Sequence, residues 1–119
     1  MMNKVIENKT IENGKYRRPV ELSGFTWQIA LPDQHKKLYV TVNHDGHRIV
    51  EVFLKGTVSN GVGILASTLL QLHYPLNEVC RKLNSVTGTH YIVFEGAVCT
   101  SEEQIAARAL QITAQKLEV

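Results

Sequence analysis

The sequence predicts an α+β fold, in which a curved antiparallel sheet of three or four strands is packed on one face by three helices. Two observations lead to this class: strand-like segments largely precede helical ones, and β-α-β alternation does not repeat. The chain has 119 residues, the size of one domain. Residues 1–14 contain too few apolar side chains to bury a face, so they predict a flexible tail ahead of a single domain at 15–119.

A central hairpin at about residues 37–55 is the clearest strand signal. Asp45 and Gly46 suit the tight turn between its two arms. Residues 25–31, followed by a turn at 32–34, and residues 90–94 have the aromatic and branched side chains typical of strands. Alternating apolar residues give each arm of the hairpin one face suited to burial. They are Leu38, Val40 and Val42 in the first arm, and Val50, Val52 and Leu54 in the second.

Three helical segments follow, at about residues 62–73, 75–87 and 101–116. Asn60 can cap the first helix. Pro75 suits the start of the second helix and Gly88 its end. Thr100 stands three residues before Glu103, the arrangement of a capping box at the start of the third helix. Apolar residues at helical spacing predict the contribution of the first helix to the core: Leu65, Leu69 and Leu72.

The composition excludes several classes of function. The formal charge is +2, from 13 Lys and Arg against 11 Asp and Glu, so charge does not predict binding to nucleic acid. No run of about 18 apolar residues is present to span a membrane. The sequence shows no signal peptide, so its two cysteines are expected as free thiols in a reducing, cytoplasmic setting.

The sequence shows no recognisable catalytic arrangement. His44 and His47 can bring two imidazoles together across the hairpin turn, but two ligands do not make a metal site. Cys99 precedes the third helix, where the helix dipole can lower a thiol pKa, yet no general base accompanies it. Cys80 falls on the apolar face of the second helix and is expected in the core. We therefore predict no catalytic residue, no metal and no cofactor.

Several segments follow one another in an informative order. They are Arg18-Pro19, Gly24-Phe25-Thr26, Leu-Tyr-Val-Thr-Val-Asn at 38–43 and Glu-Val-Phe-Leu-Lys-Gly at 51–56, followed by two helices broken at Pro75. In this order the chain resembles the TSCPD domain over about residues 17–117. That domain is found at the C-terminus of adenosylcobalamin-dependent (class II) ribonucleotide reductases and as small free-standing proteins.

One departure from the family pattern lies in the segment that names it. In place of Thr-Ser-Cys-Pro-Asp, this chain has Thr100 and Ser101 followed by Glu102 and Glu103. If the cysteines serve metal binding or thiol exchange in relatives, this chain lacks that capacity.

The resemblance implies a non-catalytic accessory or regulatory module that binds a protein and is associated with ribonucleotide reduction. A chain of 119 residues cannot hold the barrel, radical-forming cysteines and nucleotide pocket of a reductase. The implied partner is a ribonucleotide reductase large chain, or a second copy that completes a homodimer. The alternative is a small nucleotide- or ligand-binding domain. Its site would combine basic and turn residues in or near the family segments: Arg17, Arg18, Asn43, Lys55 and Gly56.

Overall fold

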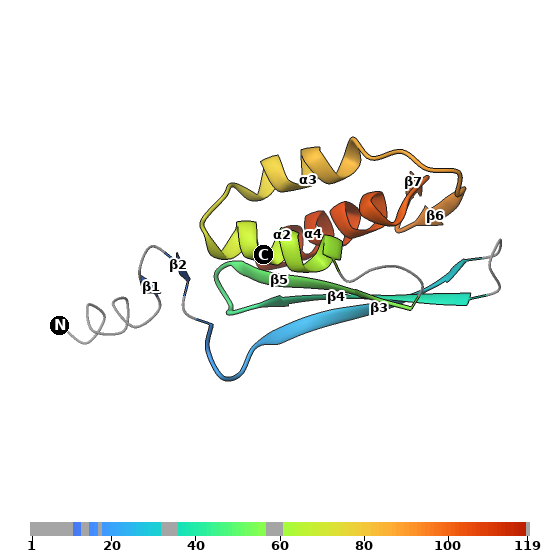
Figure 1. Ribbon diagram of the computed structural model, residues 1–119. Coiled ribbons are helices and arrows are strands. Elements are labelled where there is room, and N and C mark those ends of the chain that lie inside the picture. The colour runs from blue at the N-terminus through green and yellow to red at the C-terminus, as the bar shows by residue number, and fades with distance from the viewer. Residues whose placement is uncertain (1–10, 13–14, 17, 32–35, 57–60, 119) are drawn as a thin grey trace.

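The centre of the molecule is a three-stranded antiparallel sheet of order β3-β4-β5 (Figure 1). The computed structural model describes residues 11–12, 15–16, 18–31, 36–56 and 61–118. Its strands are β3 (Ser23–Leu31), β4 (Lys36–His44) and β5 (Ile49–Lys55). The predicted strand at 25–31 and the predicted hairpin at 37–55 are both confirmed, with β3 beginning two residues earlier than expected.

The predicted alternation of side chains is also confirmed in the hairpin. Leu38, Val40 and Val42 of β4 are fully buried, while Tyr39 between them is exposed. The buried side chains of the sheet meet those of the last helix in one hydrophobic core. Burial of apolar surface on a single face is what makes this amphipathic sheet stable. The sheet residues in this core are Ile29, Leu31, Leu38, Val40, Val42, Ile49, Val52 and Leu54.

The turn of the hairpin is closed by Asp45. Its Oδ1 accepts the backbone N–H groups of His47 and Arg48, both at 2.9 Å, and its own N–H donates to the Arg48 carbonyl at 3.1 Å. Gly46 has a φ of +97°, a conformation that side chains disfavour, which explains glycine here. The register shifts between Asn43 and His44, so the β4–β5 connection twists where it leaves the sheet.

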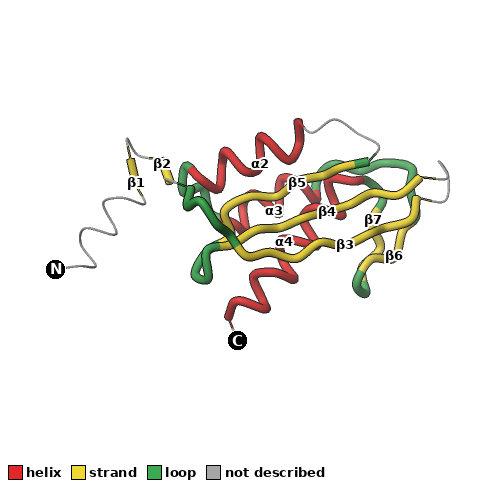
Figure 2. The backbone as a smooth tube through the Cα atoms, turned by 90° about the horizontal axis from the view of Figure 1, so that it is seen from below, coloured by secondary structure: helices red, strands yellow, loops and turns green. Residues whose placement is uncertain are grey.

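The three helices of the described residues lie on one side of the sheet (Figure 1), and the view from below in Figure 2 shows the other face of the sheet without a helix over it. They are α2 (Gly61–Gln71), α3 (Leu76–Asn84) and α4 (Glu102–Glu118). α4 supplies most of the helical part of the core, α2 adds Ala66 and Leu70, and α3 adds Val79 and Cys80 and packs on α4. This arrangement confirms the predicted α+β class.

The second helix ends earlier than expected. We predicted that it runs to Gly88, but α3 stops at Asn84 and Ser85 forms its C-cap. The Ser85 hydroxyl donates to the Lys82 carbonyl at 2.6 Å, so it competes with the next turn of the helix. Val86, which continued the apolar spacing in the sequence, is consequently outside the helix and 41% exposed.

A short ribbon precedes α4. β6 (Ile92–Phe94) confirms the strand expected at 90–94, whereas its partner β7 (Ala97–Cys99) was not predicted. Glu95 and Gly96 both have positive φ, as a two-residue hairpin turn requires. Among the described residues this ribbon forms a sheet separate from β3-β4-β5. Phe94 meets Trp27 of β3 edge to face, with ring centroids 5.9 Å apart.

Part of the predicted N-terminal tail is described. β1 (Ile11–Glu12) pairs with β2 (Lys15–Tyr16) in a two-residue antiparallel ladder. The rest of that segment, the turn predicted at 32–34 and the Asn60 cap lie outside the described residues. No helix in the described part of the chain combines the length and apolar character needed to cross a bilayer.

Candidate functional site

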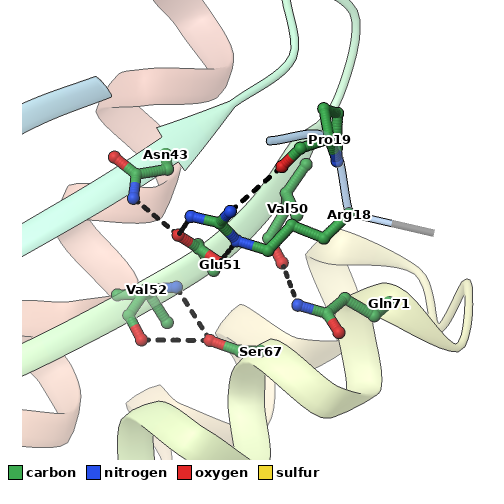
Figure 3. A network of polar contacts seen from close by, with 8 residues as sticks. All are labelled: Arg18, Pro19, Asn43, Val50, Glu51, Val52, Ser67 and Gln71. Atoms are coloured by element: carbon green, nitrogen blue, oxygen red, sulfur yellow. Dashed lines mark hydrogen bonds and ion pairs between the residues drawn. The ribbon is translucent and has the colours of Figure 1, made fainter. Parts of the chain in front are cut away.

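Glu51 of β5 is the centre of a polar network on the uncovered face of the sheet (Figure 3). Arg18 donates to it twice, from Nε to Oε1 at 2.9 Å and from Nη2 to Oε2 at 3.1 Å. Asn43 of β4 donates from Nδ2 to Oε2 at 2.7 Å. The Glu51 side chain is only 4% exposed, whereas that of Arg18 is 47% exposed. The bidentate geometry therefore ties the segment entering the fold to the central hairpin.

The same contacts decide the charge of Glu51. Burial by itself raises the pKa of this carboxyl, because the ionised form loses its water. Hydrogen bonds from Arg18 and Asn43, together with the Arg18 charge, act in the opposite direction, and the net effect lowers the pKa of Glu51. Glu51 is thus an ionised carboxylate at neutral pH that two predicted ligand-binding residues hold in place.

The residues predicted as a ligand site fall into two groups. Arg18 and Asn43 meet at Glu51, while Arg17 lies outside the described residues. Lys55 pairs with Tyr39 and Asn43 with Glu51, which places Lys55 four residues, about 13 Å, along the sheet from Asn43. The structure therefore brings two of the five together, around a partner that the sequence did not single out.

Gly56 has a structural role at that far end. Its φ is +140°, and a Cβ on it would collide with the Lys37 carbonyl. Lys55 and Gly56 are both exposed there, next to the segment 57–60 that lies outside the described residues.

α2 closes the outer edge of β5. The Ser67 hydroxyl accepts the Val52 N–H at 2.9 Å and donates to the Val52 carbonyl at 3.1 Å, as a neighbouring strand would (Figure 3). Gln71 reaches the Val50 carbonyl at 3.4 Å. Gly63 lets the helix approach, because a Cβ there would lie 2.8 Å from the Val52 oxygen. Side chains of α2 therefore provide hydrogen-bond partners for backbone groups at the outer edge of β5, where no further strand of the described residues pairs.

This packing leaves the opposite side of α2 exposed. The helix buries its small residues and Leu70: Gly63, Ala66, Ser67 and Leu70. The leucines that we expected in the core lie on the other side, so that expectation was wrong. With Ile64 they form what we call the α2 outer face, whose members are exposed to 57% (Ile64), 68% (Leu65), 38% (Leu69) and 51% (Leu72).

The α2 outer face is also uncharged. No Asp, Glu, Lys or Arg stands between Lys55 and Glu78 in the sequence. Thr68, which is also on this side of the helix, donates its hydroxyl to the Ile64 carbonyl at 2.8 Å. Apolar surface that is contiguous and uninterrupted by charge marks interaction sites in soluble domains.

Neither cysteine has the environment of a nucleophile. Burial raises the pKa of Cys80 to about 11. Burial also raises the pKa of Cys99, against the opposing charge of Arg108, so the lowered pKa expected from the helix dipole is not found. Both thiols are free and buried. In the described part of the chain, no three His, Cys, Asp or Glu side chains gather in a way that could hold a metal ion.

The segment that departs from the family motif is a helix cap. Ser101 Oγ accepts the Gln104 N–H at 3.1 Å, and Gln104 Oε1 accepts the Thr100 N–H at 2.7 Å. The capping pair is therefore Ser101 and Gln104, one residue later than predicted. Glu102 is buried at the start of α4, with Oε2 at 3.9 Å from Nε2 of His90.

Comparison with known proteins identifies one family. The family model described as the TSCPD domain matches residues 13–114. Comparisons with curated proteins and with solved structures give no match. The matched range includes the whole three-stranded sheet, all of α2 and α3, the ribbon and most of α4.

Proposed function

The chain belongs to the TSCPD domain family, which is associated with ribonucleotide reductases, and from this premise we propose that it is a non-catalytic accessory or regulatory module that binds a protein partner in the cytoplasm. The proposed partner is a ribonucleotide reductase large chain. The observation that carries the protein-binding role is the α2 outer face. A second copy of this chain is the alternative occupant of that face.

The size of the α2 outer face supports binding to a protein. Its four side chains together expose about as much apolar surface as two fully exposed leucines. Removing that surface from water is worth about 3–6 kcal/mol, at roughly 1.5–3 kcal/mol for each fully buried leucine. Association costs at least about 4 kcal/mol, so this surface offsets the lower end of that cost, and the contacts around it must supply the affinity.

Two other exposed apolar groups are smaller or more polar. Tyr91, Val93 and Val98 are exposed on the β6–β7 ribbon. On the uncovered face of the sheet, Tyr39 and Phe53 share their surface with Thr26 and Thr41, whose hydroxyls are 2.9 Å apart. The ribbon group has three residues against the four of the α2 outer face, and the sheet group is interrupted by threonines, so both areas serve as internal comparisons for any binding experiment.

The alternative of a nucleotide site at the predicted residues has less support. Arg18 and Asn43 donate to Glu51, and Lys55 lies at the other end of the sheet. A phosphate group needs several donors directed at one point. The geometry therefore favours a structural role for Arg18 and Asn43.

Light scattering after gel filtration tests the proposal. We expect the wild-type chain, mixed at micromolar concentration with the ribonucleotide reductase large chain of the same organism, to give a mixed species. Leu65→Glu should abolish it, because a charge replaces a side chain that is 68% exposed on the α2 outer face. The matched control is Val93→Glu, which makes the same kind of change at a residue 65% exposed on β6 and should leave the complex intact.

Three results would contradict the proposal in different ways. Elution of two unchanged components would overturn the reductase chain as the partner. A dimer of the wild-type chain alone, lost in Leu65→Glu, would instead assign the α2 outer face to a second copy. A complex that survives Leu65→Glu but not Val93→Glu would move the interface to the ribbon.

A further inference from the structure

A cavity of about 430 Å³ opens at the end of the molecule where the chain terminates. Three segments far apart in the sequence meet there: the β4–β5 turn, the connection from α2 to α3, and the last turns of α4 (Figures 1 and 2). We call it the turn pocket. Its volume is within the range of sites for small molecules, roughly 300–1,000 Å³. None of the predicted ligand-binding residues that the structure describes lines it.

The lining of the turn pocket is apolar with a concentration of basic groups. Leu70, Leu76 and Leu117 contribute apolar surface, and Arg48, His47 and His73 contribute a guanidinium and two imidazoles. Among the described residues, Glu118 contributes the only carboxylate side chain of the lining. An apolar wall with a few convergent polar groups is the usual composition of a binding site, and here those groups suit an anion.

Arg48 is held in position from both of its ends. The Asp45 carboxylate fixes its backbone N–H at 2.9 Å within the turn. Its guanidinium donates from Nη2 to the Leu70 carbonyl at 2.8 Å and lies with Nη1 2.7 Å from His73 Nδ1. Arginine has no acceptor, so His73 accepts this hydrogen bond at Nδ1 and carries its own proton on Nε2. The pair is thereby organised before any ligand arrives.

The backbone at His73 is an independent sign that its side chain is needed. His73 has a φ of +69° at the end of α2, where its N–H donates to the Leu70 carbonyl and the Tyr74 N–H to the Leu69 carbonyl. This is a Schellman ending, whose left-handed residue is most often glycine because a Cβ is strained there. This position nevertheless holds a histidine. Its imidazole lines the turn pocket beside Arg48.

We propose that the turn pocket binds a small organic anion. A phosphate or carboxylate group contacts Arg48, His47 and His73, and the apolar body of the ligand packs on Leu70, Leu76 and Leu117. This site is independent of the α2 outer face, so either can fail without the other. Glu118 disfavours ligands that place a second negative group at the α4 end of the pocket.

The test uses two anions that differ only in their charged group. Phenyl phosphate and benzoate are titrated into the 15N-labelled chain, with benzyl alcohol as the neutral control and inorganic phosphate as the control without an apolar body. We expect saturable shifts of the amides at 47–49, 70–74 and 76, with a Kd of about 1 mM or tighter for the better anion. Which aromatic anion binds more tightly distinguishes a phosphate from a carboxylate site.

Variants separate binding from folding. His73→Gly removes the imidazole and relieves the backbone strain, so its Tm should not fall while its affinity weakens at least about fivefold. Arg48→Gln should weaken binding more than about tenfold, and the matched control Lys36→Gln, which removes one exposed positive charge at the end of β4 far from the β4–β5 turn, should leave it unchanged. The proposal is overturned if benzyl alcohol shifts the same amides equally, if neither aromatic anion saturates, or if His73→Gly binds as the wild type does.

Discussion

Replacing Glu51 by Gln should destabilise the domain by about 2 kcal/mol. Breaking a fully buried ion pair costs roughly 3–5 kcal/mol, because the remaining charge stays buried without its partner. The cost of breaking the Arg18–Glu51 pair is smaller than this, because the Arg18 side chain is 47% exposed and can turn toward water. Asn43 can still donate to the amide oxygen of the new glutamine. A hydrogen bond to this neutral group is weaker than the bond to the carboxylate by about 1 kcal/mol.

The measurements are urea denaturation, which gives the free energy of unfolding, and thermal denaturation, both of Glu51→Gln and wild type at pH 7. At about 4 °C for each kcal/mol in a domain of this size, the Tm should fall by roughly 8 °C. In a double-mutant cycle with Arg18→Gln, the two changes should not add, because each removes the same pair of hydrogen bonds. A loss below about 0.5 kcal/mol, the ordinary range of surface substitutions, would refute a structural role for this network.

The pH dependence of stability gives a second check on Glu51. Its pKa is lowered in the folded state, so its contribution is fully present above the unfolded value of about 4.3. That contribution is lost as the pH falls through the folded pKa, where the carboxylate is protonated. The acid limb of the stability curve should therefore be shallower in Glu51→Gln. Identical limbs in the two proteins would contradict the lowered pKa.

Two further predictions follow from buried positions. Gly63→Ala should destabilise the domain by about 1–3 kcal/mol in urea denaturation, because the new Cβ would lie 2.8 Å from the Val52 oxygen. Alanine normally favours a helix by about 1 kcal/mol over glycine. A stabilised variant would therefore contradict the close packing of α2. Cys80, with a pKa of about 11, should react with a disulfide reagent at pH 8 far more slowly in the native chain than in urea. Rapid native labelling of Cys80, read by mass spectrometry, would show that the helix pair α3–α4 opens.

The hairpin was predictable because its signal is local. A period of two in both arms fixes which side chains face the helices, and a turn pair between the arms fixes their register. β7 was missed since three residues next to a helix cap are too short for any period to show.

The orientation of α2 was not predictable from spacing, because two stripes of the helix have the helical period. One contains the leucines, and the other contains Gly63, Ala66 and Ser67. Packing against the edge of β5 selects the stripe that is buried. Only small residues allow the helix axis close enough for Ser67 to form a hydrogen bond with Val52. Such a requirement comes from the partner element and is not visible in the helix sequence.

The candidate sites show a similar division. The sequence singled out Arg18 and Asn43, which do come together, but their shared partner Glu51 is 33 residues from Arg18. An acidic residue inside an otherwise apolar arm was the available signal for a buried ion pair. Arg48 and His73 are 25 residues apart, and only the fold brings them to one pocket.

The most direct test of the protein-binding role follows the methyl groups of the α2 outer face by NMR while the unlabelled ribonucleotide reductase large chain is added. The account predicts that the methyl signals of Ile64, Leu65, Leu69 and Leu72 shift or broaden in a saturable way, while those of Val93 and Val98 on the ribbon do not. Unchanged α2 methyl signals at saturating partner, or changes confined to the ribbon, would contradict the assignment of α2 as the docking surface.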